Sequence, residues 1–233
     1  DGSINTTYTS VNTTSGFSIV KYQGTGANAT VGHGLGAVPK MILFKSLTNA
    51  ISWIVYSSEL NISSSNCLRL NGTNAAFTES AWNGTRPTTS VFSLGIHNEA
   101  NNSSGETIAY CFADVQGYSK FGSYTGNGNA DGTFVYTGFK PSWIMIKRTD
   151  NVNQWIMLNN KMSLYNNNTG DELYADSSAV QNSFVDGGAD FLSNGFKLRG
   201  TNGSVNLNGG SYIYMAFAEA PLVGTNNVPA NAR

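Results

Sequence analysis

One apolar stretch occurs twice in the chain, first as Pro39-Lys40-Met41-Ile42-Leu43-Phe44-Lys45 and then, 102 residues later, as Pro141-Ser142-Trp143-Ile144-Met145-Ile146-Lys147. At the same offset, Trp53-Ile54 returns as Trp155-Ile156. Four or so apolar residues in a row, bounded by polar residues, have the length of a buried strand rather than that of a helix. A sequence that repeats itself at a fixed spacing indicates repeated structural units.

The repeat continues to the end of each copy. After a small insertion, Phe92-Ser93-Leu94 matches Phe196-Lys197-Leu198. Residues 108–114 (IAYCFAD) then match residues 213–219 (IYMAFAE). The sequence therefore predicts a lead-in over residues 1–15, a first unit over 16–116, a second unit over 117–221 and a C-terminal tail over 222–233.

Strand signals dominate both copies. Segments such as residues 17–22 and 107–115 are rich in aromatic and β-branched side chains and end in turn-forming residues, as strands do. Asn-Gly pairs recur between these segments, for example at Asn71 and Asn194. No segment shows helical periodicity over about eleven residues. We predict an all-β fold of two tandem β-sandwich, jelly-roll-like units, with about seven strands in each.

The composition excludes two classes of partner. Charged residues are 12% of the chain and the net charge is −1, whereas 40% of the residues are hydrophobic, enough for a buried core. Lys and Arg nowhere cluster, so we expect no nucleic-acid partner, because phosphates bind clustered basic residues. No apolar stretch approaches the roughly 18 residues of a membrane span, so we expect no membrane partner.

The residues that enzymes use are scarce. The chain has two histidines, His33 and His97, and neither stands beside a run of Asp, Glu or Cys. Asp114 and Glu219 occupy equivalent places in the two units, which favours a shared structural role over one catalytic pair. No known catalytic motif is present. The sequence predicts a protein that is not an enzyme and has no cofactor.

Two aromatic residues are candidates for glycan binding, which uses exposed rings among polar neighbours. Trp82 stands beside Asn83-Gly84, and Tyr165 precedes three asparagines. Turn residues around them favour exposure, although each ring could instead close the end of its sandwich. Trp53 and Trp155, which recur at the same place in both units, are expected in the core. We expect the same of Phe44 and Phe112 in the first unit and of Ile146 and Phe217 in the second.

One loop offers oxygen atoms of the kind that calcium binds. Its candidate ligands are Asn127, Asn129 and Asp131. The corresponding loop of the first unit, residues 25–30, has no carboxylate, so a Ca²⁺ site would be confined to the second unit. We keep this metal as an alternative to a protein without any cofactor.

Four segments carry a resemblance to a known group of proteins: residues 1–4 (DGSI), 16–20 (GFSIV), 24–36 (GTGANATVGHGLG) and 110–115 (YCFADV). Residues 122–128 and 185–198 add to it, so that it covers nearly the whole chain. These segments resemble a repeat module of tailed phages, especially marine ones, found in structural or tail-fibre-like proteins of uncharacterised function. The resemblance implies a virion setting, several modules in one chain and a module before residue 1, but no catalytic residues.

These observations favour a phage protein at the virion surface, outside the cell, either a tail fibre or spike or another adhesion module that contacts the host. A capsid decoration protein, such as a cement or head-fibre protein, is the first alternative. A carbohydrate-binding module is the second, with host-surface polysaccharide as its ligand. Other virion proteins are expected partners in all of these settings.

We predict that the chain is a homo-oligomer, with a trimer as the expected form. Strand edges are normally protected by Lys, Pro or bulges, and the chain has only five Pro and 13 Lys plus Arg. Neighbouring subunits would cover the edges and the tail. Sedimentation of the purified chain at micromolar concentration measures the state. A single copy with an uncovered tail in a map of the particle would contradict the prediction.

Overall fold

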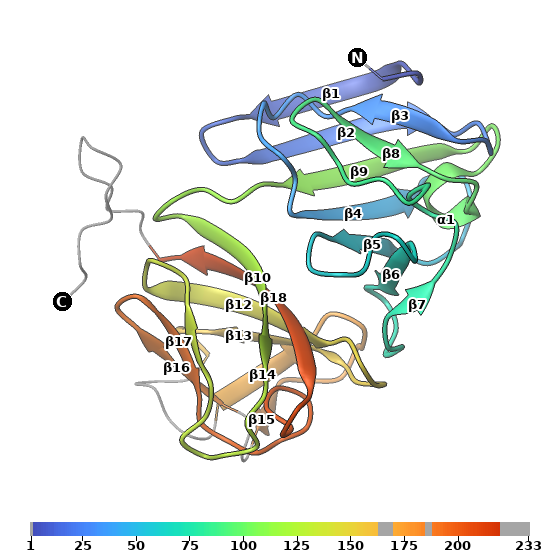
Figure 1. Ribbon diagram of the computed structural model, residues 1–233. Coiled ribbons are helices and arrows are strands. Elements are labelled where there is room, and N and C mark those ends of the chain that lie inside the picture. The colour runs from blue at the N-terminus through green and yellow to red at the C-terminus, as the bar shows by residue number, and fades with distance from the viewer. Residues whose placement is uncertain (1, 163–169, 185–187, 220–233) are drawn as a thin grey trace. The chain divides into compact units, whose positions relative to one another are not determined.

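The computed structural model describes residues 2–162, 170–184 and 188–219 (Figure 1). The chain divides into two compact units, Asp1–Asp114 and Val115–Arg233. The division lies two residues before the boundary that the sequence predicts. Both units are built almost entirely of antiparallel strands, so the all-β sandwich prediction is confirmed.

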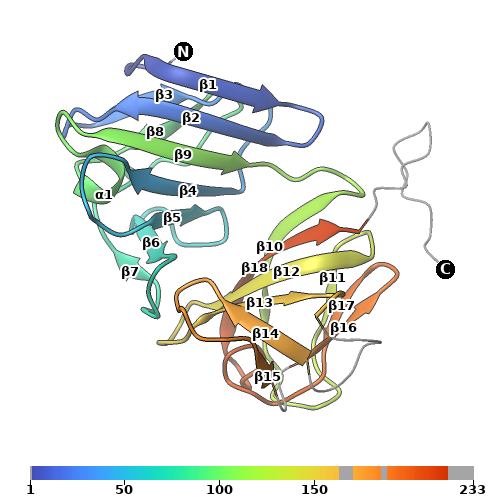
Figure 2. The same ribbon diagram turned by 180° about the vertical axis from the view of Figure 1, so that it is seen from behind.

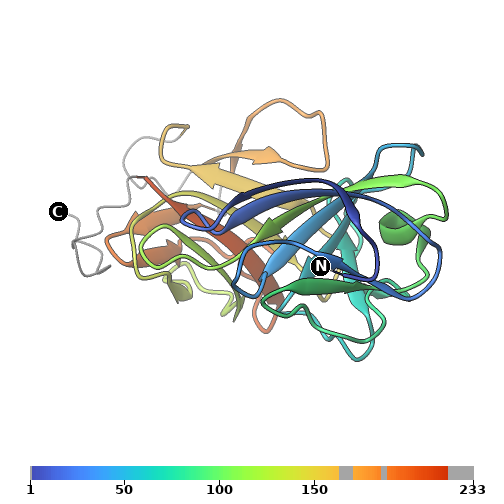
Figure 3. The same ribbon diagram turned by 90° about the horizontal axis from the view of Figure 1, so that it is seen from above.

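Unit 1 has a large sheet of seven strands in the order β1-β2-β9-β4-β5-β6-β7 and a small sheet in which β3 pairs with β8. Figure 3 views the two layers from above. The helix α1 (Asn98–Asn101) is a single turn. The strands are β1 (Thr6–Asn12), β2 (Phe17–Gln23), β3 (Ala29–Gly32), β4 (Met41–Ser46), β5 (Ile54–Ser57), β6 (Asn66–Arg69), β7 (Phe77–Thr78), β8 (Val91–Leu94) and β9 (Glu106–Phe112).

The core of unit 1 lies between its two layers. Strand β2 alternates buried and half-buried side chains, which places Val20 and Tyr22 against the core. Phe44 of β4 meets Phe92 of the small sheet edge to face, with ring centroids 5.3 Å apart. The alternation has a period of two, so one register decides which side chains of each strand are buried.

Unit 2 has a sheet of six strands in the order β10-β18-β12-β13-β14-β15 and a sheet of three in the order β11-β17-β16 (Figure 2). Among the described residues, no helix is long and apolar enough to cross a membrane. The strands are β10 (Ser119–Thr125), β11 (Phe134–Tyr136), β12 (Pro141–Arg148), β13 (Trp155–Asn159), β14 (Gly170–Tyr174), β15 (Asn182–Phe184), β16 (Ala189–Leu192), β17 (Gly195–Leu198) and β18 (Ser211–Ala218).

The two units share a strand order. Read from β2, the large sheet of unit 1 runs β2-β9-β4-β5-β6-β7, and the elements in the same places of unit 2 run β10-β18-β12-β13-β14-β15. Individual contacts also correspond. The hydroxyl of Tyr22 donates to the carbonyl of Ala100 at 2.5 Å, and that of Tyr124 donates to the carbonyl of Val205 at 2.7 Å. Superposition of the two units as copies stays a prediction.

The lead-in is part of unit 1, which corrects the prediction that residues 1–15 precede the unit. Strand β1 pairs with β2 along the whole of its length. Ile4 is buried and bridges to Val31 of the small sheet. The sequence did not reveal this strand because its Thr and Ser residues lack an apolar periodicity. The predicted tail, residues 222–233, lies outside the described residues.

Three of the six residues expected in the core are buried and three are not. Phe44, Ile146 and Trp155 are each at most 1% exposed. Phe112 and Phe217 are half-buried, because the side chains that face the core of their strands belong to the residues before and after them. Trp53 is also half-buried and stacks on Tyr110, with ring centroids 6.0 Å apart.

Substitution of the two equivalent tryptophans should have unequal effects. We expect Trp155→Ala to lower the free energy of unfolding by about 3–5 kcal/mol, because it leaves a large cavity. Trp53→Ala, the matched control, should cost less because its ring is already partly in water. Urea unfolding followed by circular dichroism measures both. A loss below about 1 kcal/mol for Trp155→Ala would show that its ring is not packed as described.

Candidate functional site

Trp82 is not an exposed platform for sugars, which corrects one candidate from the sequence. Its side chain is 1% exposed, and its ring lies 5.2 Å from that of Phe44 and 5.7 Å from that of Tyr56. Its indole Nε1 donates to the carbonyl of Asn66 at 3.1 Å. Burying the apolar ring inside the sandwich lowers the free energy more than leaving it exposed over a turn. The second candidate, Tyr165, lies outside the described residues.

The candidate calcium loop is organised by protein contacts. The side-chain oxygen of Asn127 accepts hydrogen bonds from the Asn129 backbone N–H at 3.0 Å and from the Asn206 amide at 3.1 Å. The side-chain oxygen of Asn129 accepts from the Asp131 N–H at 2.9 Å. These bonds are those of successive Asx turns. A cation would have to compete with each of them.

Asp131, the one carboxylate of that loop, already faces two cations. Its Oδ1 lies 2.5 Å from Lys197 Nζ and 3.4 Å from Arg199 Nη1. The hydrogen bond from Lys197 and the two positive charges lower the pKa of Asp131. Among the described residues, no group of three His, Cys, Asp or Glu side chains is placed to hold a metal. The Ca²⁺ site stays a prediction.

A buried asparagine holds this loop, and sequence reasoning missed it. Asn206 is fully buried, and its amide donates to the carbonyls of Asn129 at 2.9 Å and Gly200 at 2.8 Å. Its side-chain oxygen accepts from the backbone N–H of Asn127 at 2.9 Å. One side chain therefore satisfies backbone and side-chain groups of two segments, the loop of Asn127 and Asn129 and the turn at Gly200, which is the condition for burying an amide at low cost.

Unit 1 contains the same arrangement around Asn101. This side chain is also fully buried, and its amide donates to the carbonyls of Ala27 and Gly95, both at 2.7 Å. Its oxygen accepts from the N–H of Thr25 at 2.8 Å. A sequence signal existed, because each asparagine stands four residues before a glycine, Gly105 or Gly210, in otherwise dissimilar loops.

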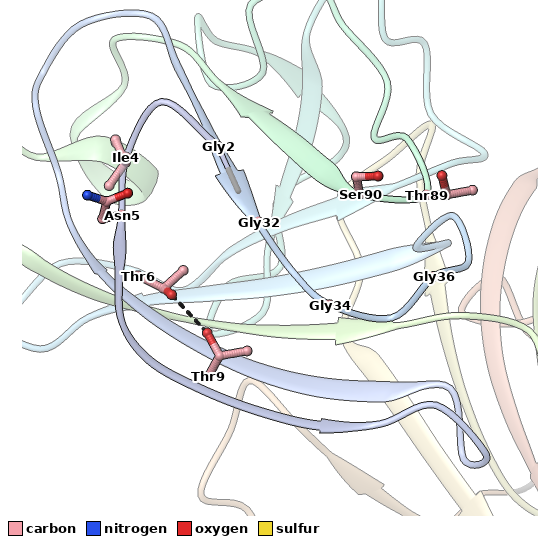
Figure 4. Close-up of a pocket in the computed structure, with 10 residues that line it drawn as sticks. All are labelled: Gly2, Ile4, Asn5, Thr6, Thr9, Gly32, Gly34, Gly36, Thr89 and Ser90. Carbon is pink, nitrogen blue, oxygen red and sulfur yellow. Dashed lines mark hydrogen bonds between the residues drawn. The ribbon is translucent and has the colours of Figure 1, made fainter.

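A groove of about 430 Å³ opens on unit 1 (Figure 4). Its walls come from the N-terminal segment between Gly2 and Thr9, from the loop that follows β3, and from Thr89 and Ser90. The hydroxyls of Thr6 and Thr9 lie on one wall and are joined by a hydrogen bond of 3.0 Å. The groove is of the size that small ligands occupy.

Gly34, in the loop that follows β3, lets this loop and β1 lie close together. Its φ of 73° lies in the left-handed region, which other residues rarely adopt. A Cβ at this position would stand 2.8 Å from Cγ2 of Val11, so a side chain there would push β1 away. Gly34 therefore allows β1 to approach the loop.

His33 anchors the same loop from inside. It is fully buried, its Nε2 lies 3.1 Å from the carbonyl of Thr88, and its Nδ1 accepts from the backbone N–H of Leu35 at 3.2 Å. These contacts require a neutral imidazole with the proton on Nε2. Burial lowers the pKa of His33. The residue holds the groove in shape and does not line it.

Among the residues that the structure describes, no ionisable side chain lines the groove. Its walls are glycine backbone, hydroxyls, one amide and Ile4. Such a surface can donate and accept hydrogen bonds but cannot transfer protons at neutral pH or supply a nucleophile of raised reactivity. The described walls of the groove therefore offer hydrogen bonds to a polar ligand.

Unit 1 should lose stability in mild acid through His33. Its pKa is lowered in the folded state, so the unfolded chain binds the proton first, below its ordinary pKa of about 6.5. The stabilisation is complete above that pH and declines as the pH falls below it, by at most about 1.4 kcal/mol per pH unit. Unfolding in urea at pH 7.5 and 5.5 measures the decline.

Two variants isolate this effect. His33→Gln cannot take up the proton, so the difference in unfolding free energy between the two pH values should shrink. His97→Gln, which changes the other histidine, should keep the full difference. An equal pH dependence in His33→Gln and in the unaltered chain would contradict the assignment.

Comparison with known proteins places the chain in a family. No curated protein and no solved structure matches it. One family model matches residues 1–221 and is described as a domain of unknown function (DUF7483). The match takes in both units and the lead-in strand β1. Because it spans nearly the whole of the 233 residues, the chain belongs to this family.

Proposed function

We propose that this protein is a non-enzymatic surface protein of a phage particle, a tail-fibre or spike module that adheres to the host surface. The observation that carries the proposal is the groove of unit 1, whose walls, as far as the structure describes them, offer hydrogen bonds and no ionisable side chain. A surface of this kind recognises a ligand without altering it. The resemblance of the sequence to tailed-phage structural modules supports the virion setting.

Three groups that enzymes often use as nucleophiles or bases, the two thiols and the imidazole of His33, are buried. Cys67 and Cys111 are free thiols, and burial raises the pKa of each to about 12, so that neither forms a thiolate at neutral pH. Both ring nitrogens of His33 are used within the protein. This supports a role in binding rather than in catalysis.

Strand β1 supports assembly with other chains. It lies at the edge of the large sheet of unit 1, and six of its seven residues are exposed. It contains no charged residue and no proline, two of the devices that keep an edge strand from pairing with another chain, and its irregular register is confined to its start, between Thr6 and Tyr8. An edge of this kind suits a protein that works in many copies on a particle.

Immunogold labelling of particles whose genome encodes the chain tests the proposal. We expect antibodies against the chain to label the tail. Label on the head would instead support capsid decoration, and particles without label would contradict a virion role. Antibodies absorbed with the purified chain are the control.

Adhesion is tested separately by competition. Host cells incubated with the purified folded chain should adsorb the phage more slowly, because the chain occupies the sites that the particle uses. The heat-unfolded chain should have no effect. Unchanged adsorption with saturating folded chain would contradict the adhesive role.

A further inference from the structure

Strand β11 of unit 2, labelled in Figure 2, carries two aromatic side chains that are exposed. Phe134 is 44% exposed and Tyr136 is 65% exposed, whereas Val135 between them is 5% exposed and packs in the core. The alternation of a strand puts both rings on the same outward face, roughly 6.6 Å apart along the chain. Large rings exposed as a pair are uncommon on a protein surface unless they meet a partner.

Both rings lie against glycines, and this determines how they present their faces. A Cβ at Gly195, on the neighbouring strand, would stand 3.1 Å from Cε2 of Phe134. A Cβ at Gly138 would stand 3.5 Å from the hydroxyl of Tyr136. Because glycine has no side chain, nothing at positions 138 and 195 covers the two rings, and their outer faces stay accessible.

The backbone beneath the rings is held in place. Gly195 pairs with Tyr136 across the two strands, and its missing Cβ would be 2.1 Å from the carbonyl of Val135. The turn after β11 is fixed because the N–H groups of Thr137 and Gly138 both donate to the carbonyl of Asn194, at 3.0 and 3.1 Å. The aromatic pair is therefore carried on a rigid support.

Charged groups border the rings and balance one another. Cross-strand pairing places Lys197 between Phe134 and Asp190. Lys197 and Arg199 both contact Asp131, and Arg199 Nε lies 2.9 Å from Asp190 Oδ2. Two cations and two carboxylates give this group no net charge. Asp131 is 76% exposed, so its carboxylate can still accept hydrogen bonds from a ligand.

Unit 1 has no such face at the corresponding strand pair. Val31 pairs with Phe92 as Val135 pairs with Phe196, which aligns the two small sheets. The positions of Phe134, Tyr136 and Lys197 are then taken in unit 1 by Thr30, Gly32 and Ser93. A difference of this size at equivalent places marks the β11 face as a specialised surface of unit 2 and not as a feature of the fold.

We propose that the β11 face binds uncharged sugar residues of a host-surface polysaccharide, with Tyr136 and Phe134 stacking on sugar rings. The carbon-bound hydrogens on one face of a pyranose carry slight positive charge and match the negative face of an aromatic ring. The sugar hydroxyls then reach the exposed carboxylate of Asp131 and the ammonium of Lys197. This inference rests on the proposed adhesive function and names its ligand and its residues.

The charge balance decides between ligand classes. A polyanionic glycan would need an excess of Lys or Arg, and the cations here are already paired with carboxylates. A neutral sugar meets no charge conflict and makes hydrogen bonds with charged partners, which are stronger than those between neutral groups. The β11 face therefore selects uncharged sugars.

Affinity electrophoresis of the full chain tests the proposal, in native gels that contain dextran, galactomannan or laminarin as neutral probes and alginate as the anionic probe. We expect at least one neutral probe to retard the chain, and alginate not to. Tyr136→Ala should weaken that binding at least tenfold, which corresponds to about 1.4 kcal/mol. Tyr136→Phe should retain it, because the ring is kept. Phe134→Ala should weaken it to a smaller extent.

Tyr8→Ala is the matched control, since Tyr8 is an exposed aromatic residue on a strand of unit 1. It should leave the binding unchanged. Each variant alters an exposed side chain, and a melting temperature equal to that of the unaltered chain verifies its fold. Retardation by no neutral probe, retardation by alginate alone, or equal binding by Tyr136→Ala would overturn the proposal. So would a dimer that Tyr136→Ala converts into monomers, because the face would then join two copies.

Competition for phage adsorption separates this inference from the adhesive function. If Tyr136→Ala slows adsorption as well as the unaltered chain does, the β11 face is not the contact surface and the adhesive function stands. If the unaltered chain does not compete at all, the adhesive function fails. Loss of competition in Tyr136→Ala alone supports both.

Discussion

A buried asparagine amide in each unit determines the shape of the surface loops around it. Asn206 and Asn101 each donate two hydrogen bonds to backbone carbonyls and accept one from a backbone N–H, and so join a nearby turn to a loop far away in sequence. A buried amide that lost these partners would be costly, so the loops keep one geometry. The loop held by Asn206 leads into β11, and the loop held by Asn101 leads into β3.

The same framework therefore carries two different surfaces. In unit 1 a glycine-rich loop follows β3, and β1 approaches this loop closely enough to form a groove. In unit 2 the corresponding strand carries Phe134 and Tyr136 and presents a flat aromatic face. The strand order of the large sheets is alike in the two units, whereas these exposed positions differ. Under the proposed function, uncharged ligands would bind by hydrogen bonds in one unit and by stacking in the other.

An adhesive protein with few charges gains a physical advantage from such surfaces. Contacts between exposed charges weaken as salt screens them, whereas stacking and burial of apolar area do not. The charges near the aromatic face are paired within the protein, as in the group of Asp131, Lys197, Arg199 and Asp190. Binding of this kind would be weak at one site and would gain strength from many copies on one particle.

The sequence alone determined the fold class and part of the core. Runs such as residues 41–44 and 143–146 predict buried strands whatever their surroundings, and Trp155 was recognised as a core residue because it recurs. The tertiary structure decided which rings meet solvent. Trp82 stands among turn residues and is buried, while Phe134 and Tyr136 lie in an apolar run and are exposed. Exposure depends on which segments pack beside a strand, and these are distant in sequence, as β1 is from the Gly34 loop that its Val11 approaches. Strands themselves pair through backbone groups that every residue possesses, so the sequence alone does not identify the partner of a strand.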